Sequence, residues 1–92
     1  MVSLMPVIYR SGSLVLMIYN EDHNPPHFHA RYQESTAVFR ISTGECTEGS
    51  LPAPQLREVR KLTAARRREL LDAWHRAQGD PPQPPGKITP LP

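Results

Sequence analysis

The chain has 92 residues and a formal net charge of +2, which leaves room for one small domain. Hydrophobic residues make up 38% and charged residues 22%, and these ordinary values exclude wholesale disorder and a fibrous repeat. The longest apolar run, residues 14–19, is far shorter than the roughly 20 residues needed to span a bilayer. No secretion signal is recognisable, so we expect a cytoplasmic protein without a membrane partner. The single cysteine, Cys46, cannot form an internal disulfide, and C-x-x-C zinc pairs are absent.

The first half of the sequence predicts a small antiparallel sheet. Its apolar runs are short, rich in strand formers and separated by turn residues such as RSGS and NEDHNPP. The expected strands cover residues 5–9, 14–19, 27–32, 35–42 and, as a short edge strand, 46–51. In the third of these, alternation puts His27, His29 and Arg31 on one face and Phe28 and Ala30 on the other.

The second half predicts one long helix, from about residue 53 to residue 78, with Gly79 as its stop. At 100° per residue one stripe would pack on the sheet, and it contains Leu56, Val59, Thr63, Leu70, Trp74 and Ala77. Six of the eleven prolines lie in the last twelve residues, where they exclude a helix or a central strand. The sequence therefore predicts an α+β domain over residues 1–79, an antiparallel β-meander of four to five strands with one long C-terminal helix packed on a face. A Pro-rich tail is expected over residues 80–92.

Three of the four histidines lie close together in the sequence, beside an aspartate: Asp22, His23, His27 and His29. A divalent transition metal held by His23, His27 and His29 would require imidazoles that converge on one point. Acid–base catalysis, which needs no cofactor, would require His27 and His29 on opposite sides of a scissile bond, supported by His23 and Asp22. A third possibility is that these histidines only brace the turn. The sequence leaves all three open.

Arginines are the candidates for binding a phosphate or RNA. Arg31 shares the face of the histidines, and Arg40 on the next strand is expected to join it. Arg66 projects onto the apolar stripe of the helix, where it either snorkels at the sheet edge or points into a site. The helix carries seven basic and three acidic residues, a net charge of +4, against −2 for the rest. This asymmetry favours an anionic partner, RNA or an acidic protein, unless the charges form an ordinary solvated face.

Several stretches together resemble a family of small bacterial domains of unknown function with the signature D-H-x-P-P-H-F-H-A. Here the signature is DHNPPHFHA, and GECTEGSLP, the helical residues Glu69, Leu70 and Trp74, and the ending KITPL extend the resemblance over nearly the whole chain. Where the family commonly has a Trp and then a His on the helix, this chain has Leu62 and Arg66. An arginine can bind phosphate but cannot ligate a metal at neutral pH, so this difference favours phosphate chemistry.

The resemblance also suggests a biological role, because such domains are similar to components of two-gene modules of the toxin–antitoxin kind. It implies a toxin-like protein that acts on RNA as an endoribonuclease and is inhibited by a small protein encoded by a neighbouring gene. His27 and His29 would be the acid and base, and an arginine would neutralise the phosphate. The alternatives are a non-catalytic, antitoxin-like binding module and a His-ligated metal-binding domain. The small core also favours a homodimer, paired through the strand at residues 5–9.

Overall fold

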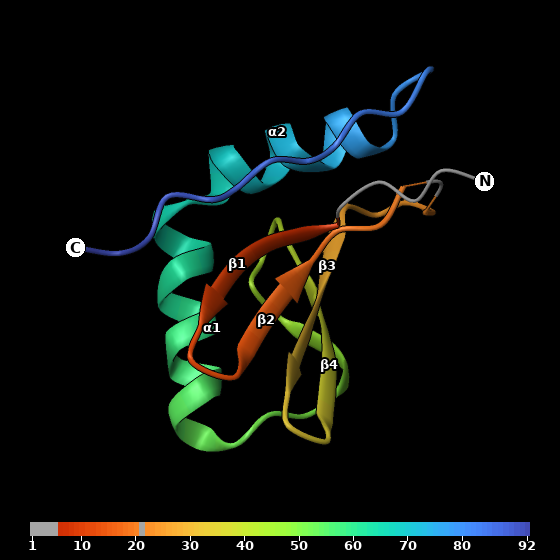
Figure 1. The fold of residues 1–92 in the computed structure, drawn as a ribbon. Helices are drawn as coiled ribbons and strands as arrows, with labels where there is room; N and C mark the ends of the chain where they lie inside the picture. Colours follow the sequence, from red (N-terminus) through yellow and green to blue (C-terminus); the bar gives the residue numbers. More distant parts are fainter. Residues whose placement is uncertain (1–5, 21) are drawn as a thin grey trace.

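Five strands form a single antiparallel sheet in which each strand pairs with its neighbours in sequence. The computed structural model describes residues 6–20 and 22–92 (Figure 1). The strands are β1 (Val7–Ser11), β2 (Leu14–Met17), β3 (His27–Tyr32), β4 (Ser35–Arg40) and β5 (Cys46–Gly49). The predicted α+β meander is confirmed, including its fifth strand and the start of β3 at His27. Met5, the expected start of the first strand, lies outside the described residues.

The two faces of the sheet carry different sets of side chains, because side chains alternate along β3 and β4. One face buries Phe28 and Ala30 of β3 with Ala37 and Phe39 of β4 in the hydrophobic core. The rings of Phe28 and Phe39, which are paired across the two strands, stack with their centroids 5.4 Å apart. The alternate residues of both strands are thereby forced onto the opposite face of the sheet.

Two helices cover the core, α1 (Ala53–Ala65) beside the sheet and α2 (Arg67–Ala77) across one end (Figure 1). The prediction of one long helix was wrong, because the chain leaves helical geometry at Arg66 (φ −124°, ψ 26°). A straight helix over residues 53–78 would be about 39 Å long, more than the 37 Å of the longest dimension of the molecule. The break lets Leu62 of α1 and Leu70 of α2 both reach the core. In the described ranges, neither helix is long and apolar enough to cross a membrane.

Residues 80–92 form neither helix nor strand, as predicted, but they pack back along α2 (Figure 1). The Ile88 side chain is 3% exposed, and its backbone N–H donates a hydrogen bond to the Ile8 carbonyl oxygen at 2.8 Å. Arg66 donates from Nε to the Thr89 carbonyl oxygen and from Nη2 to that of Pro90, both at 2.9 Å. The tail thus covers part of the β1 edge that we expected to pair with a second copy. The homodimer itself stays a prediction.

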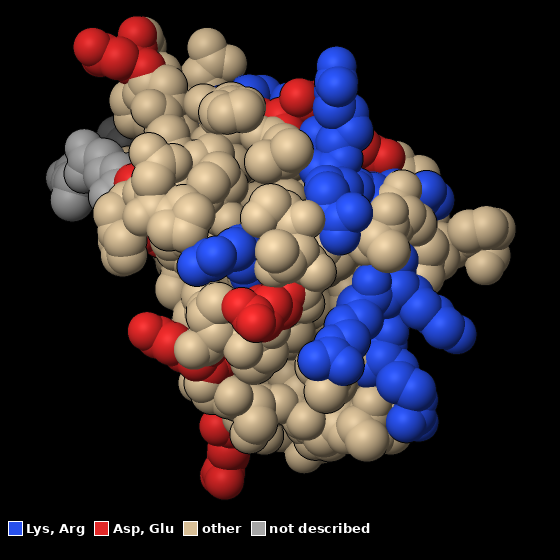
Figure 2. Space-filling model, turned by 180° about the vertical axis from the view of Figure 1, so that it is seen from behind, with Lys and Arg blue, Asp and Glu red and all other residues tan. Residues whose placement is uncertain are grey.

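Six of the seven Lys and Arg side chains of residues 53–78 fall into two groups, and the seventh, Arg68, has its Nε 4.0 Å from Asp72 Oδ1. Arg66, Arg67 and Arg76 donate hydrogen bonds to backbone carbonyl oxygens of other segments, so they hold the fold together. Arg57, Arg60 and Lys61 of α1 are exposed. Figure 2 shows Lys and Arg gathered on one side of the molecule in this view, with most of the acidic side chains elsewhere.

Shortening Ile88 tests whether the tail is part of the fold. Ile88→Ala should lower the free energy of unfolding by about 2–5 kcal/mol, because it removes a buried side chain that the surrounding core cannot replace. Lys87→Ala, at the adjacent exposed position, should change it by less than about 0.5 kcal/mol. Urea unfolding measures both values, and equal effects of the two substitutions would show that the tail is not packed.

The tail contact of Glu69 should make stability depend on pH. The Thr89 backbone N–H donates a hydrogen bond to Glu69 Oε1 at 2.9 Å. This bond, together with a hydrogen bond from the Thr89 side chain, holds the pKa of the Glu69 carboxyl below its ordinary value of 4.5. Because the folded-state pKa is depressed, the stabilisation is complete above the ordinary pKa and is lost as the pH falls through the folded-state pKa.

The variant Glu69→Gln cannot ionise, so it isolates this effect. The difference in the free energy of unfolding between wild type and variant should be largest near about pH 6 and should shrink towards about pH 3. Urea unfolding across this range measures the difference. A gap that stays constant with pH would contradict the role given to the carboxylate.

Candidate functional site

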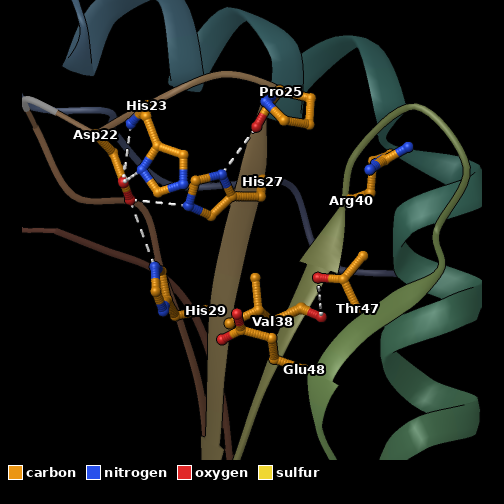
Figure 3. A pocket seen from close by; sticks show the side chains of 9 residues that line it. All are labelled: Asp22, His23, Pro25, His27, His29, Val38, Arg40, Thr47 and Glu48. Atoms are coloured by element: carbon orange, nitrogen blue, oxygen red, sulfur yellow. Dashed lines mark hydrogen bonds and ion pairs between the residues drawn. The ribbon is translucent and has the colours of Figure 1, made fainter.

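A pocket of about 190 Å³ opens on the face of the sheet opposite the core (Figure 3). Its floor follows from the strand register, in which His29 of β3 pairs with Val38 of β4, and Val38 pairs with Glu48 of β5. His27 pairs with Arg40 in the same way. The lining residues are Asp22, His23, Pro25, His27, His29, Val38, Arg40, Thr47 and Glu48. The register, together with the loop before β3, thus brings the predicted histidines, aspartate and one predicted arginine into one cavity.

Asp22 lies in the loop between β2 and β3, and Gln78 fixes this loop. The Asp22 backbone N–H donates to Gln78 Oε1, and Gln78 Nε2 donates to the Tyr19 carbonyl oxygen, both at 2.7 Å. One amide side chain at the end of α2 therefore binds this loop at two points, Tyr19 and Asp22. The Asp22 carboxylate points towards the two histidines of β3 (Figure 3).

His27 is 9% exposed, and both of its ring nitrogens face oxygen atoms that accept hydrogen bonds. Nδ1 lies 2.8 Å from the Pro25 carbonyl oxygen, and Nε2 lies 2.9 Å from Asp22 Oδ2. Both oxygens can only accept, so a neutral ring, which carries one N–H, can donate to one of them and leaves a lone pair facing the other. A metal ion bound at Nε2 would leave Nδ1–H to donate to the Pro25 carbonyl, so that both contacts would be favourable.

His29 points at the same carboxylate oxygen from the next outward position of β3. Its Nε2 lies 3.5 Å from Asp22 Oδ2, is buried and has no hydrogen-bond partner among the described residues. The ring edge packs against Tyr19, with centroids 4.8 Å apart. Asp22, His27 and His29 each offer a ligand atom, and these three atoms lie within 4.8 Å of one another. We call these three residues the triad.

The Asp22 carboxyl is held in its ionised form. Burial raises its pKa, but the hydrogen bond from the His23 backbone and the charge of His27 outweigh burial and hold the pKa below its ordinary value of 3.8. The carboxylate is therefore negatively charged at neutral pH. A charged carboxylate with two imidazole nitrogens is a donor set that suits several transition metals.

His23 does not belong to the convergent group, although it is a neighbour of Asp22. Its side chain is 87% exposed, and its Nδ1 lies 3.2 Å from Asp22 Oδ1, the oxygen that does not face His27. The structure thus brings Asp22 together with His27 and His29 where three histidines were expected. His23 lies at the open rim of the pocket.

The three predicted phosphate-binding arginines lie in different places. Arg40 lines the pocket, with a buried Nε that has no partner among the described residues, and its guanidinium points away from the histidines (Figure 3). Arg31 borders an adjoining hollow of about 340 Å³ that shares His29 with the pocket. Arg66 lines neither cavity, since it holds the tail. The suggestion that Arg66 replaces a histidine of the site is therefore not supported by its position.

Sequence reasoning missed four residues that shape the site: Val38, Thr47, Glu48 and Gln78. Alternation along the fourth predicted strand does place Val38 on the outward face, so that residue could have been found. Glu48 depends on the register of a short edge strand with an irregularity beside Val38, which no local pattern reveals. Gln78 depends on where α2 ends relative to the sheet. Contacts between segments that are distant in the sequence cannot be read from its local patterns.

The comparisons with known proteins bear on the family of the chain. Curated proteins and solved structures give no match. Residues 12–75 match the model of a protein family described as Domain of unknown function (DUF4160). The matched region covers most of the chain and includes the whole pocket lining, although it ends before Gln78 and the tail. The chain belongs to the DUF4160 family of domains of unknown function.

Proposed function

We propose that this domain binds a divalent transition metal through the triad and uses it to act on a phosphate-containing substrate. The observation that carries the proposal is the approach of two histidine Nε2 atoms to one Asp22 oxygen, at 2.9 and 3.5 Å. Side-chain nitrogen and oxygen atoms that converge on one point suit a metal ion. Acid–base cleavage would instead place the two rings on opposite sides of a phosphodiester.

The environment of the triad fits a metal ion in three further respects. Ligand atoms bound at about 2.0–2.2 Å from a metal lie roughly 3–4 Å apart, so small side-chain rotations would close the site. Metal-ligating histidines usually donate a hydrogen bond from their other ring nitrogen to a carbonyl or carboxylate, and the Pro25 carbonyl oxygen lies 2.8 Å from His27 Nδ1, where it can accept one. The unpartnered Nε2 of His29 would gain a partner. Without a partner, this buried nitrogen costs stability.

The remaining pocket residues support substrate binding at such a metal. Three protein ligands leave at least one coordination position open, as in catalytic zinc sites. The pocket extends from the triad to Glu48, which supplies a second carboxylate on the opposite wall, and to Arg40, whose guanidinium points away from the histidines (Figure 3). A metal there would polarise a phosphoryl oxygen or activate a water molecule. RNA is the substrate that the resemblance to two-gene modules suggests.

Metal titration with matched histidine variants tests the proposal. Tag-free wild type should bind one equivalent of Zn²⁺, Mn²⁺ or Co²⁺ in isothermal titration calorimetry. Loss of an outer partner of a ligand costs about 10–100-fold in affinity, so loss of a ligand in His29→Ala should cost more than about 100-fold. His27→Ala should do the same, but His27 is buried and its loss also affects packing.

His75→Ala is the control, because His75 lies exposed on α2 and lines neither the pocket nor the adjoining hollow. This variant should keep the wild-type affinity, and His23→Ala should lose much less than His29→Ala. If His29→Ala, verified as folded, binds metal as tightly as His75→Ala, the triad is not the metal site.

A second candidate function is the metal-free, toxin-like nuclease. It is favoured by the contact of His27 with a carboxylate beside a histidine nitrogen that has no partner, which provides a proton donor next to a proton acceptor. In this proposal the protein is the cytoplasmic toxin of a two-gene module, and a small protein encoded by a neighbouring gene inhibits it. The antitoxin-like, non-catalytic module is the alternative for the same role.

A chelator distinguishes the two candidate functions. If the metal proposal holds, RNA cleavage and growth arrest of a bacterial host should depend on His29, and EDTA should abolish cleavage in vitro. Cleavage that persists in EDTA and disappears in His27→Ala/His29→Ala would support the metal-free nuclease. Absence of both arrest and cleavage at good soluble expression would contradict both catalytic proposals and favour the binding module.

A further inference from the structure

We propose that the exposed face of α1 formed by Arg57, Arg60 and Lys61 binds the phosphate backbone of a nucleic acid. We call these three residues the α1 basic surface. None of them lines the pocket or the adjoining hollow, so the proposal is independent of the metal site. Their exposure leaves all three charges accessible to a ligand.

No described residue gives the α1 basic surface a structural role. The ion pairs within the described ranges join other side chains, and none includes Arg57, Arg60 or Lys61. Glu58 is the one acidic residue of α1, and it accepts a hydrogen bond from the Tyr9 hydroxyl at 2.8 Å. The other helical arginines that hold the fold, Arg66, Arg67 and Arg76, bond to backbone carbonyls. Within the described residues, Arg57, Arg60 and Lys61 make no such hydrogen bonds to other segments.

Their spacing also opposes the stability of the helix. Arg57 is three residues before Arg60 and four before Lys61, and like charges at these spacings repel on a helix surface. The first turn of α1 has no acidic residue that would offset the charges. An anionic ligand bound at these three cations would relieve this repulsion.

The surroundings of these cations favour phosphate over a protein or a membrane. Protein interfaces are anchored by buried aromatic and large apolar residues, and membrane-surface helices insert such residues into lipid. The other exposed residues of α1 are small: Ala53, Pro54, Ala64 and Ala65. The large hydrophobic side chain that is exposed in the described part of the chain is Tyr19, on another segment. Binding to a phosphate backbone requires cations alone.

Salt-dependent binding to a short fluorescein-labelled DNA duplex, measured by anisotropy, tests the proposal. For three contacted phosphates, the logarithm of the association constant should fall with the logarithm of KCl concentration with a slope of about −2.7 or steeper. The triple variant Arg57→Gln/Arg60→Gln/Lys61→Gln should bind about tenfold or more weakly at low salt, and its slope should be smaller in magnitude by about 2.7. Its melting temperature and its metal affinity should not change, because none of these side chains packs in the core or the pocket.

The matched control removes three exposed charges elsewhere, in Arg10→Gln/Arg68→Gln/Lys87→Gln, none of which lines the pocket or the adjoining hollow. This variant has the same net charge as the triple variant and should keep most of the affinity. An equal loss in the control would overturn the proposal, because binding would then follow total charge. Competition by polyglutamate as effective as that by unlabelled duplex, or no binding by wild type at low salt, would also overturn it.

Discussion

Alternation along β3 is the constraint on which the site depends. Phe28 and Ala30 are buried in the core, so His27 and His29 must point to the other face, two residues apart on the same strand. A shift of one residue in register would exchange the two sets and expose an aromatic ring, so the core fixes the positions of the histidines. The pairing of Phe28 with Phe39 fixes the same register on β4, which places Val38 and Arg40 beside the histidines.

The position of the Asp22 carboxylate depends on the helices. The break at Arg66 turns α2 across the end of the sheet, where Trp74 packs against His27 with ring centroids 5.0 Å apart and Gln78 binds the loop that carries Asp22. The tail fastens this arrangement through Arg66 and Glu69. The triad thus joins a strand, whose register is fixed by the core, to a loop fixed by the second helix. The positions of its three ligand atoms are therefore set by the fold as a whole. The side chains of the α1 basic surface, in contrast, make no contacts that hold the described segments together.

The sequence predicted those parts of the structure that depend on local patterns. Strand alternation correctly placed His27 and His29 on one face, and the turn residues correctly separated five strands. The helix break could not be predicted, because neither proline nor glycine marks Arg66 and the burial of Leu62 and Leu70 in one core is a long-range effect. For the same reason Arg66 was assigned to phosphate binding, whereas its hydrogen bonds are to the tail. The roles of Gln78 and Glu48 arise from long-range packing, and whether the triad binds a metal is a property that no sequence pattern here decides.

X-ray absorption spectroscopy of the zinc-loaded, tag-free protein tests the central claim most directly, because it reports the atoms bound to the metal. The triad predicts two imidazole nitrogens at about 2.0–2.1 Å and oxygen ligands at about 2.0–2.2 Å, one of them from the Asp22 carboxylate. In His29→Ala the imidazole contribution should fall by half. Zinc surrounded by oxygen alone, or an imidazole contribution unchanged in His29→Ala, would contradict the account.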